Sequence, residues 1–199
     1  MGALTVGAPL PEALREATVR DGAGERVTIG ALVEGRITAL VFLRHFGCVG
    51  CNKHVSDIAP RIPELDSFGI RVVFVGNGEP EHIDGFRARH QLDPAQALIV
   101  SDPELGSYRA AGLHRAVLGT VGARALWAQL RAFGAGYRQY AGDGDALQQG
   151  GALVVDARGI VAMVHRSEFI ADNADPSDLV EAALKLLLVG SPAAQRGIV

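Results

Sequence analysis

The sequence predicts an α/β fold in which a mixed central sheet carries helices on both faces. Three short runs of apolar and β-branched residues, at 37–43, 70–76 and 97–100, alternate with longer segments that have helical signals. A fourth apolar region, 151–165, is divided by the turn sequence Asp-Ala-Arg-Gly and therefore predicts a hairpin, with a helical segment after it. Apolar residues make up 48% of the 199 residues and charged residues 21%, which is typical of a globular protein with a sizeable core.

The first predicted elements are two short strands near the N-terminus. Segments 16–21 and 25–33 are alternating or apolar, and a Gly-Ala-Gly sequence separates them. This pattern predicts a small β-hairpin that leads into the main sheet.

The continuous apolar runs are expected to form strands that are buried on both faces, as in a parallel sheet. "ITALVFL" (37–43) is followed by polar residues, "IRVVFVG" (70–76) is stopped by the turn residues Asn77 and Gly78, and "ALIV" (97–100) is the third run.

Helices are expected between and after these strands. Asp102 and Pro103 are typical of a helix start, with Asp as the N-cap and Pro in the first helical position. The expected helices span 48–65 with kinks near Pro60 and Pro63, 80–90, 103–111 and 176–189. A β–α–β half followed by a β–β–α half is the arrangement of the thioredoxin fold, so we expect a thioredoxin-like fold with additions.

Two segments lie outside that minimal fold. The segment from about 112 to 149 has apolar residues at steps of three and four, which predicts a helical insertion, either packed on the sheet or forming a wall of the substrate pocket. Residues from about 190 to 199 are expected to be a flexible tail. We expect one domain over 1–199, with a core at about 25–189.

Charge and hydropathy limit the partners and the compartment. The net charge of −3 gives no electrostatic reason to expect binding to nucleic acid or to a phospholipid surface. The opening sequence has no basic segment followed by an apolar run, and no apolar stretch nears 18 residues, so we expect neither a signal peptide nor a membrane span. These features predict a cytoplasmic protein.

The two cysteines of the chain, Cys48 and Cys51, lie three positions apart between a predicted strand and a predicted helix. Cys48 is expected in the first helical turn, where solvent or substrate can reach it and where the helix dipole and free N–H groups stabilise a thiolate. Arg44 and Lys53 add positive charge, and Arg44 is expected either to hold the thiolate and polarise an incoming oxygen or to be a surface charge. Cys51 lies roughly 60° around the helix, within reach of Cys48. The pattern favours a redox pair.

Two other interpretations of the cysteine pair stay open. Both thiols could be small buried side chains. Alternatively, Cys48 and Cys51 could bind a metal with His45 and His54, or bind copper in a chaperone with a histidine such as His165. His54 is expected to project roughly 120° away from Cys48 on a regular helix, which disfavours the first of these metal sites. Otherwise His45 and His54 are expected to be solvent-facing polar residues, and His165 is expected to have a structural or surface role.

The sequence around the cysteines resembles a known family. "VFLRHFGCVGC" is similar to the active-site stretch of the peroxiredoxin-like group in the AhpC/TSA superfamily, the group that includes prostamide/prostaglandin F synthase. The similarity continues in "SDPELGSYRAAGL" (101–113) and "LQQGGALVVDARGIVAMVHRSEFIAD" (147–172), and it spans roughly residues 25 to 189.

This resemblance implies a thioredoxin-like fold and reductase or peroxidase chemistry without a cofactor. Cys48 would be the attacking thiolate and Cys51 the resolving thiol, with electrons from thioredoxin or another dithiol donor, and the chain would act on a peroxide, endoperoxide or disulfide. A general thiol–disulfide reductase is the alternative. Relatives of this kind often pair, so a homodimer is a possible assembly. We expect the substrate site to include His45, Phe46, Gly150 and Gly151.

The chain departs from the family pattern in two places. Typical peroxiredoxins have Pro-x-x-x-Thr-x-x-Cys, and here Val41 and His45 occupy the Pro and Thr positions. Thioredoxins have a cis-proline facing the cysteine pair, and here Gly150 and Gly151 take that place, which predicts room for a substrate backbone.

Overall fold

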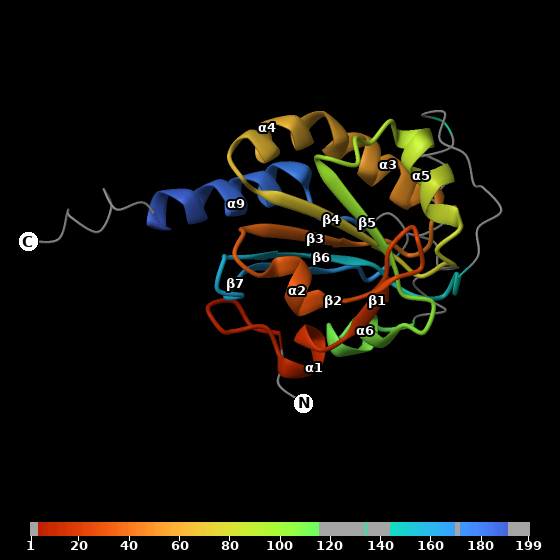
Figure 1. Cartoon of the computed structure of the whole chain (residues 1–199), viewed down its shortest axis with the longest axis horizontal. Coiled ribbons are helices and arrows are strands. Elements are labelled where there is room, and N and C mark those ends of the chain that lie inside the picture. Colours follow the sequence, from red (N-terminus) through yellow and green to blue (C-terminus); the bar gives the residue numbers. More distant parts are fainter. Residues whose placement is uncertain (1–3, 116–133, 135–143, 170–171, 191–199) are drawn as a thin grey trace, which may run out of the picture.

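The computed structural model describes residues 4–115, 134, 144–169 and 172–190 (Figure 1). Within these residues seven strands form one sheet in the order β2-β1-β5-β4-β3-β6-β7. The strands are β1 (Thr18–Arg20), β2 (Arg26–Thr28), β3 (Thr38–Phe42), β4 (Arg71–Gly76), β5 (Ala97–Ser101), β6 (Gly151–Val155) and β7 (Val161–Arg166).

The sheet is mixed, as the sequence predicts. Strand β3 pairs in parallel with β4, and β4 pairs in parallel with β5. The other pairs are antiparallel: β1 with β2, β1 with β5, β3 with β6, and β6 with β7. All five residues of β3 are buried, which confirms that the continuous apolar run lies at the centre of the sheet.

Helices cover both faces of this sheet (Figure 1). They are α1 (Glu12–Arg15), α2 (Ile29–Val33), α3 (Val49–Ile58), a 3₁₀ turn (Ala59–Arg61), α4 (Ile62–Ser67), α5 (His82–His90), α6 (Gly106–Ala110) and α9 (Pro176–Gly190). Alternate residues of β3 point to opposite faces: Val41 joins a core cluster with α3, α4, α5 and α9, whereas Leu40 joins a second cluster with α1, α2 and α6.

Three local predictions need correction. Segment 25–33 is a strand only as far as Thr28, whose Oγ1 accepts a hydrogen bond from Ala31 N at 3.2 Å and caps α2. The helix expected from Pro103 begins at Gly106, because Leu105 adopts a left-handed conformation before it. The four-residue helix α1 is absent from the predicted elements. The predicted helix over 48–65, in contrast, is confirmed as α3, the 3₁₀ turn and α4, with the bend at its prolines.

The expected insertion and tail lie mostly outside the described residues, which omit 116–133, 135–143 and 191–199. The helical insertion and the flexible tail therefore stay predictions. Across the described part of the chain, no helix is long and apolar enough to cross a membrane.

The N-terminal segment contributes to the outer side of β7. Gly7 N donates to Val161 O at 2.8 Å, Val161 N donates to Ala8 O at 2.9 Å, and Leu10 N donates to Gly159 O at 2.9 Å. Leu10 is buried in the cluster on the α1 side. This pairing fixes the start of the chain along one edge of the sheet.

Candidate active site

The candidate site lies where the parallel strands end. Arg44, Asn77 and Asp102 follow the carboxyl ends of β3, β4 and β5, and all three side chains are buried. Adjacent parallel strands end at the same edge of a sheet, so this edge collects polar groups that the core would otherwise exclude.

Cys48 and Cys51 come together at the start of α3. Cys48 is the N-cap residue, one position earlier than the expected first turn, and Cys51 lies within the helix. Both are free thiols. The expectation that Cys48 is accessible to solvent is wrong, because Cys48 is only 2% exposed and Cys51 only 4%, and both belong to the core cluster on the α3 side.

The two thiols differ in acidity. A hydrogen bond from the Cys51 thiol lowers the pKa of Cys48 to about 6, assisted by the Arg44 charge and by the backbone N–H groups of Cys51 and Gly50, against the opposing effect of burial. Burial raises the pKa of Cys51 well above its ordinary value, and the neighbouring Cys48 adds to that rise. These effects favour the thiolate form of Cys48 and the protonated form of Cys51.

Arg44 connects this pair to a distant segment of the chain. Its Nη1 lies 3.9 Å from the Cys48 sulfur, its Nε donates to Gln148 O at 3.0 Å, and its Nη2 donates to Ala146 O. A surface role for Arg44 is excluded, since the residue is buried. Two backbone carbonyls hold the guanidinium fork and leave one nitrogen directed at the thiolate.

Lys53 does not share that role. It forms an exposed ion pair with Asp57 one turn along α3, and it is not among the groups that shift the pKa of Cys48. The positive charge near the thiols therefore comes from Arg44.

Three further buried residues, which were not predicted as site residues, contribute to the candidate site. Gln148 is buried, and its carbonyl binds Arg44. Asn77 Nδ2 donates to Asp145 O at 3.3 Å, next to the Ala146 carbonyl that Arg44 binds. Tyr108, buried on α6, donates its hydroxyl to the carbonyls of Leu43 and Val75. Tyr108 lies within 101–113, a segment that resembles the family. This resemblance was the one feature of the sequence that could have indicated its contribution to the site.

His45 and Phe46 are buried rather than open to a pocket. Burial, and then the Arg44 charge, lowers the pKa of His45 to about 4, so its ring is neutral at pH 7. Its Nδ1 accepts a hydrogen bond from Gly47 N at 3.3 Å. Phe46 packs against Phe86 with ring centroids 5.3 Å apart, and a Cβ at Gly76 would lie 2.3 Å from its ring. Both side chains support the loop that leads to Cys48.

Gly150 and Gly151 are required by close backbone approach. A Cβ at Gly150 would lie 2.5 Å from Phe42 O, and one at Gly151 would lie 2.6 Å from His165 O. The space predicted for a substrate backbone is thus occupied by the neighbouring strands β3 and β7.

Two of the histidines considered as metal ligands, His54 and His165, have backbone hydrogen-bond partners. His54 is buried, contrary to the surface role expected for it, and it hydrogen-bonds the backbone of Ala174. His165 Nε2 lies 3.2 Å from Asp172 O. Among the residues that the structure describes, no group of three His, Cys, Asp or Glu side chains could hold a metal ion. Neither metal interpretation finds its ligand set there.

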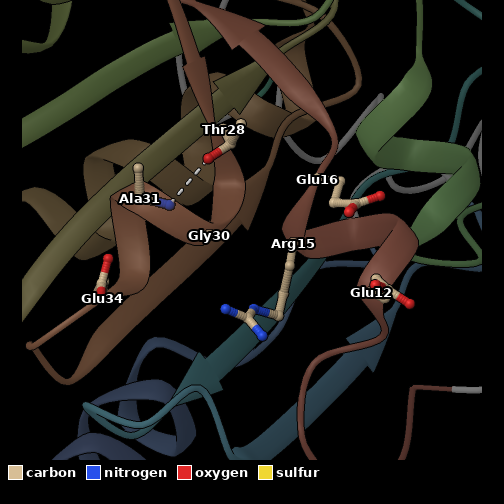
Figure 2. Close-up of a pocket in the computed structure, with 7 residues that line it drawn as sticks. All are labelled: Glu12, Arg15, Glu16, Thr28, Gly30, Ala31 and Glu34. Atoms are coloured by element: carbon tan, nitrogen blue, oxygen red, sulfur yellow. Dashed lines mark hydrogen bonds between the residues drawn. The ribbon is translucent and has the colours of Figure 1, made fainter.

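A cavity of about 330 Å³ lies on the opposite face of the sheet, between α1 and α2 (Figure 2). Its lining residues are Glu12, Arg15, Glu16, Thr28, Gly30, Ala31 and Glu34. None of them is a thiol, and the cavity belongs to the α1 side whereas the cysteines belong to the α3 side.

The sequence matches the family model described as AhpC/TSA antioxidant enzyme over residues 57–168. That match begins after both cysteines. Peroxiredoxin-like 2C of Mus musculus is 31% identical over 180 residues, covering 84% of this chain and 77% of that protein. Prostamide/prostaglandin F synthase of Homo sapiens is 34% identical over 149 residues, covering 71% of this chain and 72% of that protein.

Solved peroxiredoxin structures share the fold. Peroxidoxin BcpB from Mycobacterium tuberculosis superimposes with a TM-score of 0.64 at 16% identity, covering 94% of this chain and 99% of that one. Bacterioferritin comigratory protein of Xanthomonas campestris, described with alkyl peroxide reduction activity, gives 0.63 at 16% identity, covering 94% of this chain and all of that one. The mixed sheet with helices on both faces is therefore a thioredoxin-like fold, and the chain belongs to the AhpC/TSA antioxidant enzyme family.

Proposed function

We propose that this protein is a thiol-dependent oxidoreductase that cycles Cys48 and Cys51 between dithiol and disulfide. The observation that carries the proposal is the placement of both thiols beside Arg44, whose Nη1 lies 3.9 Å from the Cys48 sulfur and whose backbone N donates to the Cys51 sulfur at 3.1 Å. This arrangement lowers the pKa of Cys48, whereas burial raises that of Cys51. A thiolate is the nucleophile, and a protonated partner beside it supplies the proton and then the second sulfur.

The proposed cycle balances with a hydroperoxide as oxidant. The Cys48 thiolate attacks the terminal oxygen, the O–O bond breaks, and the leaving alkoxide takes a proton to become an alcohol while Cys48 becomes a sulfenic acid. Cys51 then attacks the Cys48 sulfur, and the S–O bond breaks to release water and form the disulfide. A dithiol donor such as thioredoxin reduces the disulfide by thiol–disulfide exchange. Arg44 would stabilise the thiolate and polarise the oxygen being attacked.

Family membership supports peroxide-type chemistry, and one structural feature favours the alternative of a general thiol–disulfide reductase. The threonine position of typical peroxiredoxins is taken by His45, whose ring is buried and whose Nδ1 is already bonded to Gly47 N. A disulfide substrate needs no such group to orient it. The substrate is thus proposed as a peroxide, an endoperoxide or a disulfide, and a panel of these separates the two activities.

The proposed cycle also bears on the cellular compartment of the protein. A cycle that depends on a dithiol donor suits the reducing cytoplasm. A single domain over 1–199 stays a prediction, and a homodimer stays one candidate assembly. Because His45, Phe46, Gly150 and Gly151 are occupied by packing, their proposed contribution to the substrate site is to shape the backbone around Cys48.

Replacing each cysteine should block the proposed cycle at a different step. Cys48→Ser removes the nucleophile and should abolish turnover, since the remaining Cys51 thiol is protonated at neutral pH. Cys51→Ser should stop the cycle halfway and leave Cys48 as a sulfenic acid or a mixed disulfide. Mass spectrometry of each variant after one equivalent of oxidant measures this difference. An adduct on Cys48→Ser with none on Cys51→Ser would reverse the two roles.

The substrate class is tested by thiol consumption with a thioredoxin recycling system. Hydrogen peroxide, an organic hydroperoxide, an endoperoxide and insulin disulfides form the panel, with Cys48→Ser as the blank. Turnover of insulin alone would establish the disulfide reductase. Inactivity on every substrate would refute the proposed enzyme.

A further inference from the structure

The second step of the proposed cycle poses a chemical problem at Cys51. To close the disulfide, Cys51 must react as a thiolate, yet burial raises its pKa well above the ordinary value. Oxidation of Cys48 removes the neighbouring negative charge but leaves the burial. Some group must therefore stabilise negative charge on the Cys51 sulfur at that stage.

One peptide unit contacts the Cys51 sulfur from the strand side. Arg44 N donates to Cys51 Sγ at 3.1 Å. The carbonyl of the same peptide unit, Leu43 O, accepts a hydrogen bond from the Tyr108 hydroxyl at 2.6 Å. The hydroxyl and the sulfur thus bind the two ends of a single amide group.

The hydroxyl of Tyr108 is held firmly in this position. It also lies 2.8 Å from Val75 O, the carbonyl that accepts Leu43 N at 2.8 Å. The ring packs edge-on against Phe42 with centroids 5.2 Å apart, and Tyr108 is fully buried. A bond at this distance, in surroundings without water, is a strong one.

A donor bound to an amide oxygen draws electron density toward that oxygen and makes the N–H of the same amide a better donor. Hydrogen bonds in chains strengthen one another in this way in a low-dielectric interior. A hydrogen bond to the charged form of an acid stabilises that form. Tyr108 therefore acts on Cys51 through the Leu43–Arg44 peptide without touching the sulfur.

We propose, on the basis of the function proposed above, that Tyr108 is a positioning residue for the resolving step, in which its hydroxyl polarises the Leu43–Arg44 peptide toward the Cys51 sulfur. In the first step, attack by Cys48, the Cys51 thiol stays protonated and donates its hydrogen bond to Cys48, so no negative charge develops on the Cys51 sulfur and this path is not needed. Loss of the hydroxyl should slow disulfide closure and spare the attack.

Methyl methanethiosulfonate separates the two steps. The Cys48 thiolate attacks the sulfenyl sulfur and releases methanesulfinate, which leaves a methyl disulfide on Cys48. The Cys51 thiolate then attacks the Cys48 sulfur, the bond to the methylthio group breaks, and methanethiolate leaves as the internal disulfide forms. Acid quenching followed by intact-mass measurement gives the rate of each step in the full-length protein.

Tyr108→Phe removes only the hydroxyl oxygen. Closure at neutral pH should slow roughly three- to tenfold, the equivalent of one hydrogen bond, while formation of the Cys48 adduct keeps its rate. The slowing should keep this factor while Cys51 is mostly protonated and should shrink only as pH approaches its raised pKa, where Cys51 ionises without help. The ionisable groups that bear on Cys51 are Cys48, Arg44 and Tyr108 itself, and the adduct state removes the charge of Cys48.

Ser107→Ala is the matched control. It deletes a neighbouring buried hydroxyl on the same helix, but that hydroxyl donates to Asp102 at 2.6 Å and not to Leu43. It should lower thermal stability without changing the rate of closure. Equal slowing of closure in both variants, or an equal slowing of Cys48 adduct formation in Tyr108→Phe, would overturn the role of Tyr108.

Two further results decide the remaining cases. If Tyr108→Phe does not fold, 3,5-difluorotyrosine placed at position 108 provides a stronger donor and should speed closure; an unchanged rate would refute the inference. If the unaltered protein forms the Cys48 adduct but never closes it, the proposed dithiol cycle fails, and the inference fails with it.

Discussion

The cavity between α1 and α2 and the surroundings of Cys48 lie on opposite faces of one sheet and differ in their polar groups. Around the cavity, Glu12, Arg15, Glu16 and Glu34 are exposed to solvent (Figure 2). Around Cys48, the charged and polar side chains are buried, and backbone groups hold them in place.

This difference shows that the strongest electrostatic effects in this protein do not coincide with its open cavity. Solvent screens the charges around the cavity, so they have little effect on one another. Burial around Cys48 makes each charge and hydrogen bond act strongly, which is why two thiols of the same type acquire opposite acidities. The thiols that we propose to react therefore lie where the chain is packed and not where it is open.

The largest effect is expected at acidic pH, where the buried His54, on the same side of the sheet as Cys48, should lower the stability of the fold. Burial lowers the pKa of His54 to about 4, against 6.5 for the free side chain. Between these values the unfolded chain holds a proton that the folded protein does not, so stability falls as pH drops below 6.5 and is unaffected above it. At about pH 5 this difference destabilises the fold by about 2 kcal/mol. Urea unfolding at neutral pH and at about pH 5 measures the loss.

His54→Gln should reduce that acid-induced loss by a similar amount, whatever it does to stability at neutral pH. His45, whose pKa burial also lowers to about 4, should continue to destabilise the variant in acid. His114→Gln, which deletes an exposed imidazole, provides the reference for losing a histidine. An acid-induced loss of the same size in His54→Gln and in the unaltered protein would contradict the buried, neutral state of His54.

Removal of the Arg44 charge should produce the next largest effect. Arg44→Met raises the pKa of Cys48, because the thiolate loses its nearby cation, and alkylation by iodoacetamide at neutral pH should slow roughly three- to tenfold. Arg44→Lys keeps the positive charge but lacks the forked guanidinium donors. Its alkylation rate should therefore lie between those of the unaltered protein and Arg44→Met. Lys53→Met, which removes a cation paired with Asp57, should leave the profile unchanged. If the alkylation rate of Arg44→Met matched that of the unaltered protein from about pH 5 to 9, Arg44 would not stabilise the Cys48 thiolate.

The smallest effect is expected from the cavity itself. Arg15→Ala removes its one lining cation on the opposite face of the sheet. Because this charge is exposed and belongs to the other side of the core, the alkylation rate of Cys48 should stay within about twofold. The same iodoacetamide assay measures it, and a larger change would mean that the two faces are coupled.

The strands were the most predictable part of the fold. A continuous apolar run such as 38–42 can be satisfied only by burial on both faces, so its sequence alone indicates a central strand. Short helices were not predictable in this way. Helix α1 has only four residues, too few to show a periodic pattern. Helix α6 starts late because Leu105 is left-handed, and the Asp102 carboxylate accepts a hydrogen bond from Ser107 N.

Within the candidate site, local sequence indicated the cysteine pair and Arg44 but not the groups that tune them. Arg44 binds the carbonyl of Gln148, 104 positions along the chain, and Tyr108 binds that of Leu43, 65 positions away. No pattern in a short segment carries such contacts. For the same reason the burial of Cys48 escaped prediction, since it depends on which distant elements pack over the start of α3.

The pairing of the N-terminal segment with β7 has a consequence for association between chains. A strand at the edge of a sheet offers unpaired N–H and C=O groups to any other extended chain. Residues 7–10 already bind 159–161 and anchor themselves through the buried Leu10. A chain shortened by its first ten residues would open that backbone to neighbouring copies, and its defect would show as aggregation while the chemistry at Cys48 remained intact.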